Sequence, residues 1–152
     1  NLSYGGAAGA MLSNTHDMVS WVRALYGNNN SYQVLQDKQR KELTSLVCDP
    51  RVSPKTVCVS GDPATPKIGG FGLGVAEIYK QPYGEIWWYT GETLGHMVSY
   101  LWIPEKDTVI CVAGNVARFG STHQYTLILS LNILQILYPS GSDITWPFGI
   151  KN

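Results

Sequence analysis

The segment from Trp87 to Asn115 constrains the fold of this chain more than any other stretch. It contains three apolar runs, which are separated first by a glycine-bounded turn and then by a polar turn from Pro104 to Asp107. The last run, Val109 to Ala113, consists of β-branched and small residues, which is typical of a buried strand. A polar turn with a proline between two apolar runs favours an antiparallel hairpin. We therefore expect three consecutive strands in this segment.

The composition of the whole chain is that of a single domain of ordinary size. The 152 residues are 44% hydrophobic and only 14% charged, which provides for a core and leaves little for a solvated surface. A formal net charge of zero argues against a nucleic-acid partner. No apolar run reaches the roughly 18 residues of a membrane-spanning helix. Because the first residue is Asn1, we interpret this end as a cut site, upstream of which a targeting segment could have stood.

Two helices are expected in the first third of the chain. The first follows the small residues from Gly5 to Ala10 and begins at Asn14, an N-cap residue with Asp17 three positions later. It ends at Gly27. The second runs from Leu35 to Val47, and its charged residues form a solvated side. The apolar residues of the first helix recur at helical spacing and define one face: Met18, Trp21, Val22 and Leu25.

The middle of the chain is interpreted as a loop followed by a short strand. Asp49 to Pro66 contains four prolines, so it is expected to be loop. The run from Gly69 to Val75 lacks the glycine spacing of a dinucleotide-binding fingerprint, and no Lys-Ser or Lys-Thr follows it. We interpret it as a strand whose glycines let another backbone or side chain cross closely. Further on, Thr122 to Leu137 predicts a helix that is apolar around most of its circumference and is therefore buried on more than one side.

The chain has three cysteines. Cys48 and Cys58 flank a loop, and a disulfide between them would imply an oxidising compartment; two unpaired thiols are the alternative. Cys111 lies inside an apolar strand and is interpreted as a small buried hydrophobic residue. No spacing of cysteines and histidines matches a zinc site, so we expect no metal and no other cofactor.

Motifs within the same segment carry a family resemblance. The matching residues are Tyr89-Thr90-Gly91, Thr93, Gly95, Ser99-Tyr100, Ile103-Pro104-Glu105-Lys106 and Asn115. Their order and spacing resemble the third active-site motif and following hairpin of serine β-lactamases and penicillin-binding proteins. Class C β-lactamases and their esterase and D-alanyl-D-alanine carboxypeptidase relatives are the most similar. The chain departs from that family at two positions: Tyr89 replaces the cationic residue of the triplet, and His96 replaces the usual Phe.

Two further segments agree with this resemblance. In the family, small residues, Met-x-Ser-Thr and an Asp-bearing helix follow the helical subdomain, and the passage from Gly5 to Met18 is similar. Phe71 to Gly74 resembles a Tyr-Gly-Leu-Gly strand of the family. The resemblance implies an α+β fold with an antiparallel sheet of about three or four strands flanked by helices, as in the C-terminal portion of the β-lactamase-like fold. Residues 1–152 would form a single segment of that fold, somewhat under half of such an enzyme.

The nucleophile of that family has no counterpart in this chain. It is the serine of Ser-x-x-Lys, and no serine here has a lysine three residues later. The letters of the family's Tyr-x-Asn motif recur in Tyr26-Gly27-Asn28, but at a helix end, so we interpret them as a helix stop. The resemblance therefore implies that the nucleophile, the first strands of the sheet and the helical subdomain belong to an absent N-terminal part. Without an activated serine, the chain alone is expected to be inactive.

The resemblance assigns substrate positioning to this chain. In the family, the backbone N–H after the triplet glycine is one of two oxyanion-hole donors, and that position is Glu92 here, after Gly91. Tyr89 and Thr90 take the positions that bind the substrate carboxylate or assist proton transfer. A tyrosine carries no charge at neutral pH, so esters or neutral amides are expected rather than β-lactams. The alternative for Tyr89 is an aromatic strand residue packed beside Trp88.

Three further residues complete the candidate site. Thr93 and Asn115 border the cleft in the family, and His96 is a candidate polar group of the site, with a structural role as the alternative.

Two classes of function remain. The chain is either the C-terminal part of a serine hydrolase, acting through an acyl-enzyme on a small-molecule or peptide substrate, or a non-catalytic binding or scaffold domain. An upstream Ser-x-x-Lys followed by Tyr-x-Asn would favour the first class.

The resemblance also implies a partner. In the full enzyme the strand from Thr108 to Ala113 would be central, paired on one edge with Leu101 and its neighbours and on the other with the missing N-terminal part. In this chain the second edge would be bare, apolar, β-branched and free of proline. We therefore expect association with the missing N-terminal part of the same protein or self-association through this edge. Separately, we expect a periplasmic or secreted location.

Overall fold

Four strands form the sheet in the computed structural model, which describes residues 5–27, 33–46, 70–93, 95–116 and 125–139. All neighbouring strands are antiparallel, and their order in the sheet is their order in the chain. The expected α+β architecture with an antiparallel sheet flanked by helices is therefore confirmed at this coarse level. The strands are β1 (Ala76–Lys80), β2 (Gly84–Thr93), β3 (His96–Ile103) and β4 (Thr108–Gly114).

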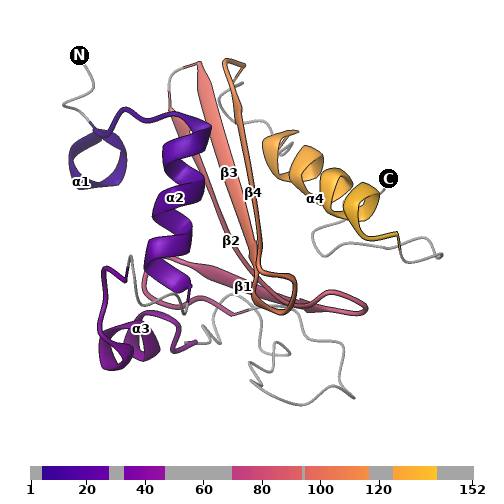
Figure 1. Ribbon diagram of the computed structural model, residues 1–152. Coiled ribbons are helices and arrows are strands. Elements are labelled where there is room, and N and C mark those ends of the chain that lie inside the picture. Colours follow the sequence, from indigo (N-terminus) through magenta and orange to yellow (C-terminus); the bar gives the residue numbers. More distant parts are fainter. Residues whose placement is uncertain (1–4, 28–32, 47–69, 94, 117–124, 140–152) are drawn as a thin grey trace, which may run out of the picture.

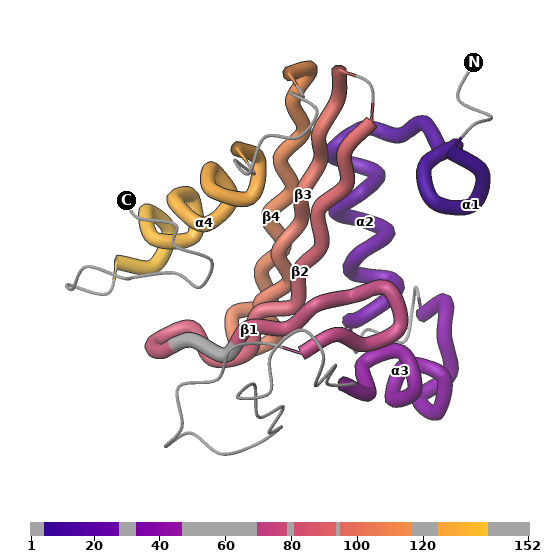
Figure 2. Tube along the Cα trace, turned by 180° about the vertical axis from the view of Figure 1, so that it is seen from behind, coloured from indigo at the N-terminus to yellow at the C-terminus, as the bar shows by residue number. Residues whose placement is uncertain are grey.

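Helices cover both faces of this sheet. Helix α2 (Thr15–Tyr26) packs on β3 and β4, and helix α4 (Tyr125–Leu137) packs on the same two strands. Figure 1 shows α2 and α4 on opposite sides of the sheet, so the molecule has three layers. Figure 2, seen from behind, shows two shorter helices at opposite ends of α2: α1 (Gly6–Gly9) and α3 (Asp37–Leu43).

The hairpin predicted around the Pro104 turn is confirmed. Residues Pro104–Lys106 form one turn of 3₁₀ helix, η2, and Asp107 then adopts the left-handed conformation with φ of 44°. β3 and β4 pair from Met97 opposite Gly114 to Ile103 opposite Thr108. Proline suits the first position of this turn because it has no backbone N–H, and none is required at that position.

One hydrophobic core lies between the sheet and α4. The leucines that α4 directs toward the sheet recur at i, i+4 and i+7, so they form one buried stripe. They meet side chains from every strand, because alternate residues of a strand share a face. The main members are Leu127, Leu131 and Leu134 from the helix and Ile78, Ile86, Trp88, Leu101, Ile103 and Ile110 from the sheet.

A second core lies between the sheet and α2. Val22 and Tyr26 are buried there against Trp87 of β2 and Trp102 of β3. The predicted helix face is right for Val22, but Trp21 is 49% exposed. Positions 22 and 26 lie one turn apart on the line that meets the sheet, whereas position 21 lies at its margin. The buried aromatic residue of this helix is therefore its last residue and not the tryptophan.

The ends of the helices follow local hydrogen bonds. Asn14 is the N-cap of α2, as predicted: its side chain accepts a hydrogen bond from Asp17 N at 2.9 Å. The helix ends at Gly27, also as predicted. Helix α3 is shorter than the expected Leu35 to Val47: its N-cap is Gln36, and it runs from Asp37 to Leu43. The expected start of the last helix, Thr122, and the residue Val47 lie outside the described residues.

The glycine-rich run before β1 is a bend and not the expected strand. Only Phe71 makes an isolated bridge, with Ala76, and Gly74 adopts a φ of 76° that a strand does not contain. Leu73 N donates to Leu43 O at 2.9 Å, and a Cβ at Gly72 would collide with the same carbonyl oxygen. The prediction of a close backbone approach at these glycines is thus confirmed, but the approach is to the end of α3.

Two predictions about burial are wrong: that Cys111 in β4 is buried, and that the last helix is buried on more than one side. In β4 only Ile110 is buried, and Cys111 is half-buried, because β4 pairs with β3 alone among the described strands. Helix α4 is buried on its sheet side only. Its outward residues Leu129, Ile136 and Leu137 are 50%, 77% and 53% exposed. None of the helices in the described part of the chain is both long and apolar enough to cross a membrane.

Candidate functional site

The second half of β2 carries most of the residues that the sequence assigns to the site. β1 pairs with β2 only from Gly84 to Trp88, whereas β3 pairs with β2 as far as Thr93. From Tyr89 onward, the edge of β2 that faces away from β3 has no strand partner among the described residues. Alternate residues of a strand direct their N–H and C=O groups to the same edge. This open half-edge therefore presents backbone donors and acceptors beside the candidate residues.

The remaining candidate residues lie at the same end of the sheet. The register places His96 of β3 opposite Thr93 of β2. Asn115 follows Gly114, whose partner Met97 is the residue after His96. His96 and Asn115 are exposed and Thr93 is half-buried. The structure therefore brings these three candidates to one end of the sheet, adjacent to the open half-edge.

The candidate side chains of β2 are divided between its two faces. Trp87 packs with the α2 core and Trp88 with the α4 core, so odd-numbered residues of β2 face α2 and even-numbered residues face α4. The α2 face thus takes Tyr89, Gly91 and Thr93, and the α4 face takes Thr90 and Glu92. The residues of the sequence motif therefore share one strand, but their side chains do not share one face.

The hydroxyl of Thr90 is engaged within the sheet. Its Oγ1 donates to the backbone oxygen of Val98 on β3 at 3.1 Å. This hydrogen bond ties the triplet position to the neighbouring strand and holds the middle of the half-edge in place.

Tyr89 belongs to a row of three tyrosines on the α2 face. It is 43% exposed and lies opposite Tyr100 of β3. The Tyr100 hydroxyl is 2.9 Å from that of Tyr26 in α2, and the two ring centroids are 6.2 Å apart. Burial raises the pKa of Tyr26, and burial together with the neighbouring tyrosines raises the pKa of Tyr100. The two inner hydroxyls therefore stay protonated well above neutral pH.

Reasoning from the sequence did not find this row. Tyr26 was interpreted only as part of a helix stop, and Tyr100 only as a match to a family motif. Two signals point to the pair: Tyr26 lies four residues after Val22 on the buried face of its helix, and Tyr100 has the same strand parity as Trp102. Their contact depends on how α2 crosses the sheet, which no local pattern specifies.

A pocket of about 410 Å³ opens on the same face, toward the other end of β2. Tyr26, Trp87 and Trp102 give it an aromatic wall, and all three are nearly buried. Charged residues of both signs also line it: Arg40, Lys41, Glu85 and Asp107. Tyr26 is shared by this pocket and the tyrosine row, so the two features adjoin.

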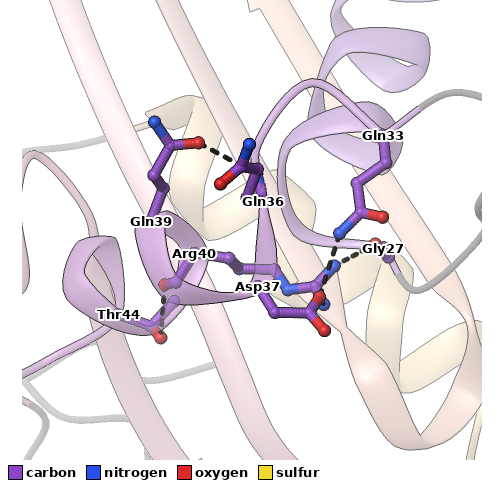
Figure 3. Close-up of polar contacts among 7 residues, drawn as sticks. All are labelled: Gly27, Gln33, Gln36, Asp37, Gln39, Arg40 and Thr44. Atoms are coloured by element: carbon purple, nitrogen blue, oxygen red, sulfur yellow. Dashed lines mark hydrogen bonds and ion pairs between the residues drawn. The ribbon is translucent and has the colours of Figure 1, made fainter.

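Arg40 is already occupied by contacts within the chain. Its guanidinium donates to Gly27 O at 2.7 Å and forms an ion pair with Asp37 at 2.6 Å, as Figure 3 shows. Gln33 donates to the same Asp37 oxygen at 3.1 Å. These bonds fasten α3 to the end of α2, so Arg40 shapes the pocket rather than offering it a free cation.

Comparison with family models, with curated proteins and with solved structures found no match to this chain. Within the described ranges, no three His, Cys, Asp or Glu side chains are grouped so as to hold a metal ion. The candidate disulfide pair, Cys48 and Cys58, lies outside the described residues. The function must therefore be argued from the geometry of β2 and its neighbours.

Proposed function

We propose that this chain is the C-terminal part of a serine hydrolase of the β-lactamase and penicillin-binding-protein type. It supplies the strand of the active-site triplet and one wall of the oxyanion hole for hydrolysis of an ester, amide or peptide through an acyl-enzyme. The observation that carries the proposal is the open half-edge of β2. The triplet Tyr89 to Gly91 begins where β1 stops pairing, so the motif lies on the half-edge that has no strand partner among the described residues.

A free strand edge suits this role chemically. An extended substrate can lie along the edge and accept hydrogen bonds from the backbone, as peptides do when they add to a sheet. The N–H of Glu92 is the proposed oxyanion donor, because it follows the triplet glycine. A backbone donor held by a sheet is preorganised, and such donors stabilise developing charge by about 3 to 4 kcal/mol. The bond from Thr90 to β3 supports that rigidity.

Tyr89 determines the class of substrate in this proposal. Its side chain is 43% exposed and lies on the face covered by α2, so it is available to a ligand at the edge. A phenol hydroxyl donates or accepts a hydrogen bond but does not supply the charge of a lysine. Binding of a substrate carboxylate is therefore weak, and the preferred substrates are neutral esters or amides. Thr93, His96 and Asn115 border the same end of the site.

The nucleophile and its proton acceptor come from the N-terminal part of the protein. The experiment is to extend the reading frame upstream and treat both the whole protein and this chain with a fluorophosphonate probe. We expect Ser-x-x-Lys upstream, stoichiometric labelling of the whole protein, and no labelling of the chain alone. Labelling of the chain alone, or an upstream sequence without an activated serine, contradicts the proposal. The second result would favour a non-catalytic binding or scaffold domain, to which the loss of the triplet cation also points.

The same whole protein tests the role of Tyr89. We expect Tyr89→Phe to lower the turnover of p-nitrophenyl esters while the thermal unfolding temperature stays nearly unchanged, because a half-exposed hydroxyl contributes little to stability. Tyr125→Phe is the matched control: Tyr125 is 47% exposed on α4, a helix that packs on β3 and β4. Equal activity of the two variants would show that the Tyr89 hydroxyl takes no part in turnover. A loss of stability that accounts for all the lost activity would leave Tyr89 a structural role alone.

A further inference from the structure

The pocket that Tyr26 borders has walls from several elements. One wall is a pair of tryptophans, Trp87 of β2 and Trp102 of β3, which lie opposite each other in the register. Helix α3, the last residue of α2 and the turn that joins β3 to β4 supply the others. Its volume of about 410 Å³ lies in the range of small-molecule sites, which is about 300 to 1,000 Å³. The pocket is therefore large enough for a small organic ligand.

Two of the four charged residues at this pocket are satisfied by partners within the chain. Arg40 is held by the Asp37 carboxylate and by Gly27 O, and Figure 3 shows its guanidinium pointing at both. Asp107 accepts a hydrogen bond from the Arg23 guanidinium at 2.8 Å. The charges of Arg40 and Asp107 are thus largely neutralised before any ligand arrives.

Lys41 and Glu85 are the other two charged residues of the pocket. Both are exposed, and the side chain of neither forms a hydrogen bond or an ion pair within the part of the chain that the structure describes. Lys41 belongs to α3 and Glu85 to β2, so the free positive charge and the free negative charge come from different walls. A ligand that carries one charge of each sign can satisfy both.

We propose that this pocket binds an aromatic amino acid in its zwitterionic form. The carboxylate of the ligand faces Lys41, its ammonium faces Glu85, and its ring lies against the tryptophan pair. Contact between aromatic rings is favourable beyond the area that it buries, and an ammonium near a tryptophan face is favourable as well. Charge complementarity carries the choice of ligand, because a simple amine or a simple carboxylate would satisfy one free charge and be repelled by the other.

This site is separate from the proposed hydrolase site. The pocket is lined by Glu85 and Trp87 in the first half of β2, whereas the triplet from Tyr89 to Gly91 lies in the second half. The residues that line the pocket all belong to the described part of this chain. Binding can therefore be measured on the chain as it is, without the missing N-terminal part.

Ligands that each lack one feature test the proposal. Isothermal titration calorimetry at low ionic strength should find one saturable site for L-phenylalanine. Phenethylamine lacks the carboxylate, 3-phenylpropionate lacks the ammonium and L-alanine lacks the ring. We expect the dissociation constant of each to be raised by about twofold or more, which is the scale of one exposed charge pair. Added salt should weaken binding of L-phenylalanine, because Lys41 and Glu85 are both exposed.

Two variants assign the charged contacts. Lys41→Met should raise the dissociation constant of L-phenylalanine by about two- to fivefold without weakening phenethylamine, which has no carboxylate to lose. Glu85→Gln should weaken L-phenylalanine to a similar extent without weakening 3-phenylpropionate, which has no ammonium. Lys38→Met and Glu42→Gln are the matched controls, because both residues are exposed on α3 and neither lines the pocket. They should bind L-phenylalanine like the parent.

The outcomes that overturn the proposal are distinct from a failure to fold. All four variants change exposed charges, so urea denaturation should give each about the stability of the parent. Absence of saturable L-phenylalanine binding by the parent overturns the proposal. Binding that Lys41→Met and Glu85→Gln leave unchanged, or equal binding of the amine, the carboxylate and the amino acid, also overturns it. None of these results changes the labelling expected of the whole protein by a fluorophosphonate, so the proposed hydrolase function stands or falls separately.

Discussion

At the scale of single residues, the hydrogen-bonded pair Tyr26 and Tyr100 is a feature that responds to alkaline pH. Burial raises the pKa of both hydroxyls in the folded chain, whereas tyrosines of the unfolded chain ionise near pH 10. The unfolded state therefore loses its protons first as the pH rises. The stability that the pair contributes is fully present below about pH 10 and is lost as the pH rises from there toward the raised native values.

Replacing both tyrosines tests this linkage. We expect the free energy of unfolding of Tyr26→Phe/Tyr100→Phe to fall less steeply with pH above about pH 10 than that of the parent. At neutral pH the change should be about 1 kcal/mol or less, because removing both partners leaves no buried hydroxyl unpaired. Urea denaturation across alkaline pH measures it, with Tyr125→Phe as the control for an exposed tyrosine. Parallel pH profiles of parent and double variant would refute the assignment.

At the scale of elements, α2 depends on its N-cap. Asn14 accepts from Asp17 N at 2.9 Å and donates to the Asp17 carboxylate at 2.8 Å. We expect Asn14→Ala to lower the free energy of unfolding by about 1 kcal/mol, and Asn14→Ser to restore most of it, since serine is also a good N-cap. Ser13→Ala is the control beside the cap. Urea denaturation that finds Asn14→Ala and Ser13→Ala equal would show that the cap does not matter.

At the scale of the whole molecule, one sheet is shared by two cores. Leu131 is 1% exposed between α4 and the sheet, whereas Leu129 on the same helix is 50% exposed. We expect Leu131→Ala to cost about 2 to 5 kcal/mol, because it opens a cavity in a packed core, and Leu129→Ala to cost about 0.5 kcal/mol or less. Because the cores share β2, β3 and β4, tyrosine fluorescence and circular dichroism should report one unfolding transition. A large cost at Leu129 would mean that another polypeptide covers α4.

Features that depend on a few neighbouring residues could be predicted from the sequence, whereas features that depend on contacts between distant segments could not. The hairpin at Pro104, the N-cap at Asn14 and the helix end at Gly27 were predictable because each depends on a few neighbouring residues. The bend at Gly72 and Gly74 was predicted as a strand, because an apolar run with glycines has no period that distinguishes the two. It bends where it meets the end of α3, a segment far away in sequence.

By itself, the sequence determined the local structure of this protein: three successive strands from residue 87 to 115, two of the helices, and the position of the triplet on a strand. Only the tertiary structure decided what lies beside that strand. It placed Tyr26 against Tyr100, ended the pairing of β1 at Trp88, and left β4 on the outside of the described sheet. The physical reason is that hydrogen-bonding capacity and apolar periodicity are encoded residue by residue. Which edge or face stays open depends instead on where other elements end, and that follows from packing the whole chain.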